Sequence, residues 1–361
     1  MFQEIYNCKI LYLMDNLFLA YSKGKVFIYD KEKCKRITQA NIPMPLWSKF
    51  FARIRVLERI FRLEPRLAFL DTQNNMCITY HGCIYKIDFY AKNVSAVYFF
   101  RPGMNAPLSV TTIKETANFH KQTVFGEYFD GAKSRVSIIS ENIYYKKVYE
   151  FVMGQINHIH GIVQDIYRDK VYILTGDTDE GSGIWESTDD FATVKPLLIG
   201  KQMYRCCVLF PTKTGLLYAT DTPLEQNSIM FIDDTNKAKK IYDMPGPCIY
   251  GKEFIDIKGK TQYVFATSVE PDSRKEKWPY LFTCQKGPGV KDYYVHIIIG
   301  NLEDGFYEVD KLKKDVFPMT LGQFGNAQFP EGNSEKNLIF TACSVKHYDG
   351  KSIKIALEEK K

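Results

Sequence analysis

The chain has 361 residues, 45% hydrophobic, 14% aromatic and 25% charged, so it can bury a large core and is not a disordered chain. Its 48 Lys and Arg against 42 Asp and Glu give a net charge of +6, but residues 46–66 alone hold six basic and two acidic side chains. The basic excess is local, which argues against a broad nucleic-acid-binding surface, and we expect no nucleic-acid partner.

The N-terminal residues 1–25 lack the pattern of a secretion signal. Glu4 stands where such a signal carries basic charge, Asp15 and Asn16 interrupt the apolar stretch, and no small-residue cleavage site follows. No apolar run approaches the roughly 18 to 20 residues that span a bilayer. The nine cysteines are an odd number without a CxxC pair, which is typical of reduced thiols. We therefore expect a cytoplasmic protein.

Residues 45–66 are the one segment with long helical periodicity. Apolar side chains recur there at three- and four-residue spacings, and basic side chains fill the remaining arc. The pattern predicts one basic amphipathic helix inserted in the fold. Residues 46–63 are a candidate contact with an anionic membrane surface at the inner face of the membrane. The alternative, which the pattern favours, is a helix packed on the protein with Arg stems covering apolar surface.

The rest of the chain alternates short runs of Val, Ile, Tyr, Phe and Thr with Gly, Asp, Asn and Pro clusters, as strands and turns do. The middle of the chain repeats: ILTGD (173–177), LYATD (217–221) and VFATS (264–268) follow at spacings of 44 and 47 residues. The predicted strands that precede these copies start at Ile159, Arg205 and Ile249, and so repeat at a similar spacing. The predicted strands that follow them start at Ile184, Ile229 and Tyr280.

A period of about 40 to 50 residues with four short strands per unit predicts an all-β fold, a β-propeller of six or seven four-stranded blades. Residues 1–361 then form a single propeller domain, with the helix at 45–66 and a long loop insertion at 271–292. A β-sandwich has no reason to repeat at fixed spacing, and the coil of a β-helix is shorter than this period.

In such blades the start of the innermost strand and the loop between the second and third strands share one face. Acids, amides, His, Arg and Tyr gather at these places, a mixture that suits a hydroxylated or carboxylated sugar. Taken singly, each acid could serve only its turn. Our catalytic candidates are Tyr204, Asp177, Asp221, Glu225 and Glu270. Our substrate-binding candidates from these positions are His158, His160, Arg205, Asn227, Tyr250 and Arg274.

His158 and His160 lie two apart on a strand, so their side chains share one side and could bind a metal ion with a carboxylate such as Asp177. The spacing fixes no third ligand, and hydrogen bonding to substrate or to neighbouring acids is favoured. We therefore expect no metal and no cofactor. With a metal, the alternative is a polysaccharide lyase in which Tyr204 is the base and Arg205 stabilises the enolate.

GIWESTDDFATV (183–194) resembles the Asp-box of sialidase-type propellers through Ser187, Asp189 and Thr193, with Phe191 and Val194 replacing its Gly and Trp. FRP (100–102) is similar to part of the sialidase Phe/Tyr-Arg-Ile-Pro motif. The sialidase likeness implies three arginines around a substrate carboxylate, roles that Arg101, Arg205 and Arg274 could fill. The box itself is a structural turn and implies fold, not activity, so no catalytic assignment is carried over.

Over most of its length the chain also resembles sialidase-like propellers encoded among bacterial surface-polysaccharide genes, through phrases such as ILTGDTDEGSGIW and GPGVKDYYVHIIIGNLEDGF. The likeness implies a cytoplasmic role in capsule or O-antigen production. Our leading hypothesis is a propeller that binds or processes a glycan or nucleotide-activated sugar. If it is an enzyme, it is a glycoside hydrolase or a lyase acting on an acidic sugar. The alternative is a non-catalytic scaffold that docks biosynthetic enzymes at the membrane.

Overall fold

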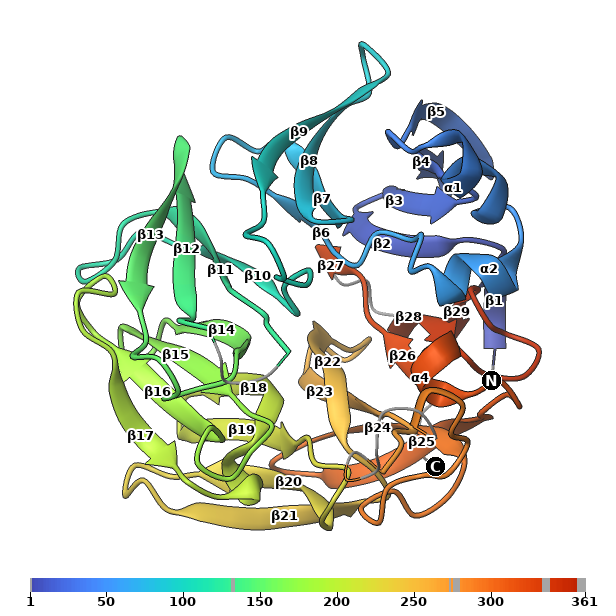
Figure 1. Ribbon diagram of the computed structural model, residues 1–361. Coiled ribbons are helices and arrows are strands. Elements are labelled where there is room, and N and C mark those ends of the chain that lie inside the picture. Colours follow the sequence, from blue (N-terminus) through green and yellow to red (C-terminus); the bar gives the residue numbers. More distant parts are fainter. Residues whose placement is uncertain (1, 131–133, 273, 275–279, 333–337, 356–361) are drawn as a thin grey trace. The chain divides into compact units, whose positions relative to one another are not determined.

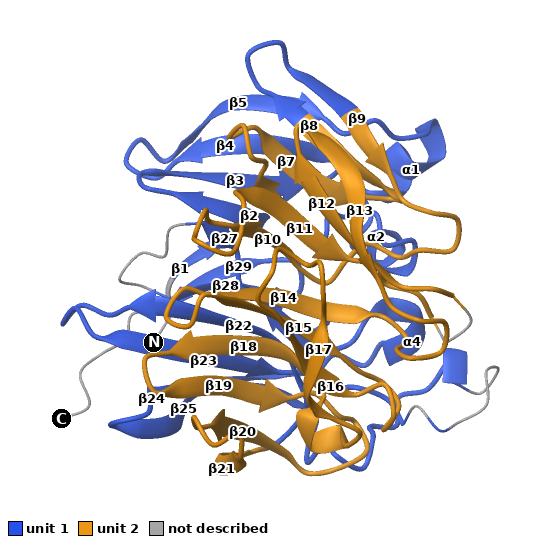
Figure 2. Cartoon of the chain, turned by 90° about the vertical axis from the view of Figure 1, so that its left-hand side faces the viewer, with its two compact units in different colours: residues 1–68, 87–95, 245–361 blue, residues 69–86, 96–244 orange. Residues whose placement is uncertain are grey.

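The runs of β-branched and aromatic residues form strands, and the Gly, Asp and Asn clusters between them form the turns (Figure 1). The computed structural model describes residues 2–130, 134–272, 274, 280–332 and 338–355. Within these residues the strands form seven sheets of four or five strands. The fold is an all-β, seven-bladed propeller with short helices near the N-terminus, which confirms the predicted class. The chain divides into two compact units (Figure 2).

Unit 1 comprises residues 1–68, 87–95 and 245–361. One of its sheets holds β2 (Lys9–Met14), β3 (Leu17–Ser22), β4 (Lys25–Asp30) and β5 (Lys35–Asn41), with β27 (Glu331–Gly332) parallel to β2. A second holds β22 (Cys248–Ile255), β23 (Thr261–Thr267), β24 (Tyr294–Asn301) and β25 (Gly305–Lys313). A third joins the two ends of the chain in the order β1 (Phe2–Tyr6), β29 (Ser352–Ile355), β28 (Leu338–Cys343), β26 (Asn326–Gln328). The described residues of this unit also form the short helices α1 (Leu46–Phe51), α2 (Arg55–Ile60) and α4 (Met319–Gly322).

Unit 2 comprises residues 69–86 and 96–244. Its three complete sheets run in chain order: β10 (Val110–Ile113), β11 (Gln122–Gly126), β12 (Ser137–Asn142), β13 (Tyr144–Glu150); β14 (Ile159–Asp165), β15 (Lys170–Thr175), β16 (Gly183–Ser187), β17 (Lys195–Ile199); and β18 (Cys206–Thr212), β19 (Gly215–Thr220), β20 (Asn227–Ile232), β21 (Ala238–Met244). A 3-10 turn, η1 (Gln202–Tyr204), precedes β18. The sheet of β6 (Ala68–Leu70), β7 (Met76–Tyr80), β8 (Cys83–Asp88) and β9 (Asn93–Phe99) lies mainly in this unit.

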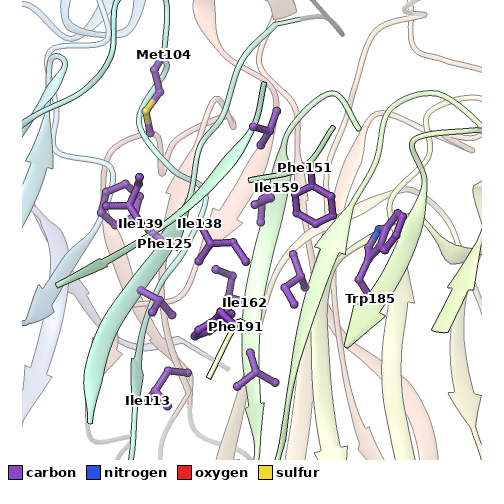
Figure 3. Packing of buried hydrophobic residues seen from close by; sticks show 14 of the residues in the cluster. Met104, Ile113, Phe125, Ile138, Ile139, Phe151, Ile159, Ile162, Trp185 and Phe191 are labelled. Carbon is purple, nitrogen blue, oxygen red and sulfur yellow. The ribbon is translucent and has the colours of Figure 1, made fainter. Parts of the chain in front are cut away.

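The largest apolar cluster of unit 2 lies between its sheets and fixes the orientation of β14 (Figure 3). Ile159 is 1% exposed and belongs to this cluster, in which Phe151 and Trp185 meet edge to face with ring centroids 5.3 Å apart. Successive residues of a strand point to opposite sides. Burial of Ile159 in the core therefore turns the side chain of the preceding residue, His158, away from this cluster.

The predicted repeat is confirmed for the first and second strands of three sheets, and it is wrong for one third strand. Leu174 pairs with Ile184 and Ala219 with Ile229, as the spacing predicts. In the next sheet Ala266 pairs with Ile297 of β24. Tyr280, the predicted start of that strand, lies instead in a helical turn. The insertion near 271–292 carries the third strand further along the chain, to the more strongly apolar run of β24.

The predicted helix at 45–66 is two short helices and not one. The chain is extended at Ile54, with φ −112° and ψ 105°, between α1 and α2. No Gly or Pro lies within residues 46–64, so local propensity does not cause the break. Tertiary contacts do: Arg55 and Arg59 of α2 turn inward and form ion pairs with Asp349 and Asp315. The basic side chains therefore do not share one solvent-facing arc.

Candidate functional site

The first strands of two neighbouring sheets in unit 2 carry a β-bulge at the same place. The pairing of β14 with β15 shifts between Ile159 and Gly161, and that of β18 with β19 shifts between Cys206 and Val208. The extra residues are His160 and Cys207. A bulge re-aims the side chain of its extra residue, and bulges are frequent beside binding sites. The sequence repeat thus brings a histidine and a cysteine to equivalent bulge positions.

His158 and His160 are both buried, and backbone carbonyls hold both rings. Nδ1 of His158 lies 2.8 Å from the carbonyl oxygen of Phe129, and Nδ1 of His160 lies 3.1 Å from that of Cys206. A carbonyl only accepts, so each Nδ1 carries the hydrogen. The two Nε2 atoms face each other at 3.0 Å. In the neutral rings both of these nitrogens present lone pairs.

Asp177 completes this arrangement from the loop after β15. Its carboxylate oxygens lie 3.3 Å from Nε2 of His158 and 3.6 Å from Nε2 of His160. Asp177 has φ +85°, a conformation that is strained for a residue other than Gly and that Asp and Asn tolerate best. The strain places its carboxylate over the histidine pair.

Gly176 allows His160 to lie where it does. A Cβ atom at this position would lie 2.2 Å from Cε1 of His160, far inside van der Waals contact. Any larger residue at 176 therefore has to displace the ring. In the two following units of the repeat, the Thr that ends the second strand is followed directly by Asp221 or Ser268. Only the first unit has a Gly between this Thr and the acidic residue, and this difference is visible in the sequence.

Arg205 and Asp221 extend the cluster. The Arg205 guanidinium lies 3.1 Å from Oδ1 of Asp177 and 3.6 Å from Oδ2 of Asp221. The thiol of Cys207 donates to Oδ2 of Asp221 at 3.2 Å. Oδ1 of Asp221 is buried without a hydrogen-bond partner among the described residues. The cluster thus combines two carboxylates and one guanidinium with the two imidazoles.

The surroundings shift the pKa values of three groups in this cluster. Burial lowers the pKa of His160, which keeps its ring neutral near pH 7. Burial also raises the pKa of Asp177, but its contacts with the imidazoles of His158 and His160 and the charge of Arg205 outweigh burial and hold that pKa well below its usual range. Burial and the negative charge of Asp221 raise the pKa of Cys207 well above its ordinary value, so Cys207 is a thiol and not a thiolate.

Two further side chains flank the cluster that the sequence did not single out. The ring of Tyr128 stacks on His158 with centroids 4.0 Å apart and an interplanar angle of 28°. Nε2 of Gln202 donates to the Asp177 carbonyl at 3.2 Å and to Asp179 at 2.8 Å, which holds the strained loop. Tyr128 follows β11 and Gln202 lies in η1. Neither lies at the start of a first strand or in a loop between second and third strands, so the repeat did not predict them at the site.

Several predicted residues of unit 2 have other structural partners. Asn227 is fully buried and stabilises loop 220–227 through its side-chain amide. The amide oxygen accepts from the Thr222 N–H at 3.0 Å, and the amide nitrogen donates to the carbonyls of Thr222 and Glu225 at 2.7 and 3.2 Å. The side chain of Glu225 is exposed, and Tyr204 is half-buried in η1. Arg101 forms a bidentate pair with buried Glu127, at 2.7 and 2.6 Å. Substrate roles for these residues stay predictions.

The remaining candidates, Tyr250, Glu270 and Arg274, belong to unit 1. Tyr250 lies in β22 and is partly exposed. Glu270 is buried and accepts a hydrogen bond from the hydroxyl of Ser268. The guanidinium of Arg274 is exposed and pairs with both oxygens of Asp272, at 2.9 and 2.8 Å. The structure thus brings together His158, His160, Asp177, Arg205 and Asp221 within unit 2.

The Asp-box-like segment forms a hydrogen-bonded turn between β16 and β17. Asp189 accepts from the hydroxyl of Ser187 at 3.0 Å and from the backbone N–H and hydroxyl of Thr193 at 2.9 and 2.7 Å. Phe191, which replaces the Gly of the box, is buried with φ +67°. That positive φ explains why the motif prefers Gly at this position. The turn is structural and does not bear on activity.

No protein-family model matches the chain, and no curated protein matches it in sequence. Solved structures resemble it in fold. The AfRom2 CNH domain has a TM-score of 0.53 at 8% identity, covering 98% of this chain and 96% of that one. The β-propeller domain of Cps50 (Swd1) from Myceliophteria thermophila has a TM-score of 0.52 at 8% identity, covering 98% and 97%. Oligogalacturonate lyase from Vibrio parahaemolyticus has a TM-score of 0.47 at 11% identity, covering 91% and 88%. At these identities the likeness shows fold alone.

Among the described residues, no helix is both long and apolar enough to cross a membrane.

Proposed function

We propose that this propeller binds a hydroxylated, sugar-class ligand at the cluster of His158, His160, Asp177, Arg205 and Asp221. The observation that carries the proposal is the convergence of these five side chains from β14, β18 and the loops after β15 and β19. Turn chemistry accounts for single acids but not for two buried histidines and an arginine beside them. Carboxylates and imidazoles are suited to sugar hydroxyls, and the stacked ring of Tyr128 offers an aromatic face nearby.

The pairing of the arginines argues against a sialidase-like carboxylate clamp. Arg101 is matched by Glu127, Arg205 by Asp177 and Asp221, and Arg274 by Asp272. A guanidinium whose charge is already balanced has little left for a substrate carboxylate. Within our proposal the ligand is therefore held mainly through its hydroxyl groups. Its source would be surface-polysaccharide synthesis in the bacterial cytoplasm, as the sequence resemblance implies.

A binding screen tests this proposal. We expect a saturable rise in melting temperature with one class among nucleotide sugars and acidic oligosaccharides, because a ligand that binds only the folded state stabilises it. Asp221→Asn and Arg205→Lys keep size or charge and should weaken that binding at least about tenfold. Arg135→Lys is the matched control, since Arg135 is exposed and pairs with Glu150. Equal binding by all variants would refute the assignment of the site.

Products from the same ligand decide whether the site is catalytic. A glycoside hydrolase would release a reducing end, and the pair Asp177 and Asp221 would supply its acid and base. A lyase would release an unsaturated sugar that absorbs in the ultraviolet, with Tyr204 as the candidate base. Binding without either product would identify a non-catalytic carbohydrate-binding protein.

A second candidate function, docking at an anionic membrane surface, has its own supporting observation. The outer side of α1 exposes large apolar side chains: Leu46 is 85%, Phe50 59% and Trp47 51% exposed. Lys49 and Arg53 are exposed beside them. An aromatic face next to cations is typical of helices that lie in the headgroup region of an anionic bilayer. A scaffold for biosynthetic enzymes would use this surface and not the His–Asp cluster.

Flotation with vesicles of neutral lipid, with and without anionic lipid, tests the membrane proposal. We expect wild-type protein to float only with anionic vesicles, and Phe50→Asp with Leu46→Asp to abolish flotation. Val152→Asp is the matched control, because Val152 is 73% exposed and lies after β13. Wild-type protein that stays at the bottom of the gradient with anionic vesicles would end this proposal and leave the carbohydrate proposal untouched.

A further inference from the structure

The hydrogen bonds of His158 and His160 leave the lone pairs of their two Nε2 atoms facing each other, which is an electrostatically repulsive arrangement. Both Nδ1 atoms donate to backbone carbonyls, of Phe129 and Cys206, so both Nε2 atoms point their lone pairs at each other across 3.0 Å. The carboxylate of Asp177 adds two more acceptor atoms within 3.6 Å. Four acceptor atoms that converge in this way are stable only around a positive charge.

We propose that His158 Nε2, His160 Nε2 and the Asp177 carboxylate bind a divalent first-row transition-metal ion. Two imidazoles and one carboxylate are a donor set for such ions. Ligands about 2.0 to 2.2 Å from a common ion lie roughly 3 to 3.5 Å apart. The observed separations of 3.0, 3.3 and 3.6 Å agree with a shared ion at little cost in rearrangement.

The residues around these ligands hold them as the outer shell of a metal site does. Each ligating histidine has its other nitrogen hydrogen-bonded to a carbonyl, which fixes the tautomer that presents Nε2 to the ion. Arg205 holds the Asp177 carboxylate, and Gly176 makes room for the His160 ring. Three protein ligands leave at least one coordination position for water or a substrate oxygen, as in catalytic zinc sites.

Asp221 supplies a second, independent observation. Its carboxylate and a ring nitrogen of His160 belong to one group of candidate ligand atoms within 4.8 Å of one another, and its Oδ1 is buried without a hydrogen-bond partner among the described residues. An unpartnered buried carboxylate oxygen costs free energy unless a ligand satisfies it. Water or a hydroxyl group bound to the ion would donate to this oxygen.

The competing explanation is a single proton shared between the two Nε2 atoms, with Asp177 as counter-ion. It satisfies the lone pairs and requires no ion. A direct measurement of metal binding separates the two explanations. This inference rests on geometry alone and does not depend on the carbohydrate proposal, so either can fail without the other.

The test uses untagged full-length protein that has been stripped with chelator and then titrated with Co²⁺ or Zn²⁺ alone. We expect one ion per chain, a visible Co²⁺ absorption band from nitrogen and oxygen ligands, and its loss when Zn²⁺ displaces Co²⁺. X-ray absorption of the zinc form should show two imidazoles and no sulfur. Failure to bind either ion, or a zinc–sulfur distance near 2.3 Å that implicates Cys207, would overturn the assignment.

Variants assign the ligands. Asp177→Asn should weaken Zn²⁺ binding at least about tenfold, and His160→Gln should abolish the Co²⁺ band. Asn tolerates the positive φ of residue 177, and the Asp177 side chain is 39% exposed, so this variant should keep its fold. His120→Gln is the matched control, because His120 is an exposed histidine of the same unit that pairs with Asp190. Unchanged affinity in Asp177→Asn, with normal circular dichroism, would contradict the proposal.

Discussion

At the scale of single residues, the site depends on backbone features as much as on side chains. His160 is the extra residue of a bulge, Asp177 has a positive φ, and Gly176 lacks the Cβ that would collide with His160. A positive φ outside Gly costs about 1 to 3 kcal/mol, which surrounding contacts have to offset. The strained φ of Asp177, next to the bulge at His160 and the close approach at Gly176, supports a binding role for the cluster.

Gly176→Ala should disrupt the site without removing any polar group. The added methyl group has no room beside the ring of His160, so the ring has to move, and overpacking of this kind costs about 1 to 3 kcal/mol. We expect a lower melting temperature together with a loss of Zn²⁺ binding comparable to that of His160→Gln. Chemical denaturation and metal titration measure the two effects. An alanine variant that binds Zn²⁺ as the wild type does would show that the position of His160 is unimportant.

At the scale of elements, ion pairs fix α2. Arg55 bonds to Glu64 at 2.7 Å and to Asp349 at 3.0 Å, and Arg59 bonds to Asp315 at 2.6 Å and to the Gly322 carbonyl at 2.7 Å. A helix of six residues is not stable alone. These buried contacts, all within unit 1, therefore decide where α2 begins and how it is oriented. They also explain why Arg55 and Arg59 are less exposed than Lys49 and Arg53.

Glu64 makes this network sensitive to acid. Burial raises its pKa, but Lys9 and Arg55 outweigh burial and lower the pKa to about 2 from an ordinary value of 4.5. A depressed carboxyl pKa stabilises the folded state fully above pH 4.5, and that contribution is lost as the pH falls toward 2. Glu64→Gln should thus be less stable at pH 7 by roughly 3 kcal/mol, with a difference that shrinks below pH 4.5.

Denaturant unfolding of both proteins between pH 3 and pH 7 measures this difference. Glu303→Gln serves as the control, because Glu303 is exposed and its pair with Lys260 lies at the surface. A gap between wild type and Glu64→Gln that stays constant over the whole pH range would contradict the prediction.

At the scale of the whole molecule, the two ends of the chain form one sheet. β1 pairs with β29 in an antiparallel ladder, with Ile5 opposite Ile353 and Tyr6 opposite Ser352. The buried hydroxyl of Ser352 accepts from Ile10 N–H and donates to the Cys8 carbonyl, both at 2.9 Å. A sheet closed by strands so distant in sequence forms only when most of the chain is in place, so we expect slow, cooperative folding.

Ser352→Ala should weaken this closure. It leaves the Ile10 N–H buried without its hydroxyl partner, whereas the Cys8 carbonyl keeps its bond from the Ser352 N–H at 3.1 Å. One such unpaired buried group costs about 1 to 3 kcal/mol. We expect a loss of roughly 1 to 3 kcal/mol in the free energy of unfolding, measured in urea. Ser95→Ala, at an exposed position of β9, should change it by less than about 0.5 kcal/mol. Equal stability of the two variants would show that the hydroxyl does not tie the chain ends.

Local patterning determined the fold class and the strand phases. Alternation and turn residues act over a few positions, so the repeat at 173, 217 and 264 predicted the strands β15, β19 and β23 from the sequence alone. The same phase argument placed His158, His160 and Asp177 close together, because they flank the paired ends of β14 and β15, where Ile159 lies opposite Thr175. The excess of acidic and basic groups at these ends was likewise visible in the sequence.

Tertiary structure decided what depends on partners distant in sequence. Arg205 is balanced by Asp177 and Asp221, and Arg55 turns inward to Asp349. Both outcomes follow from contacts between residues that lie far apart along the chain. The third strand at β24 and the break between α1 and α2 have the same origin. Side-chain alternation is a property of a single strand and can be read from the sequence. Charge pairing and strand register across an insertion are properties of the assembled sheets, so they depend on the tertiary structure.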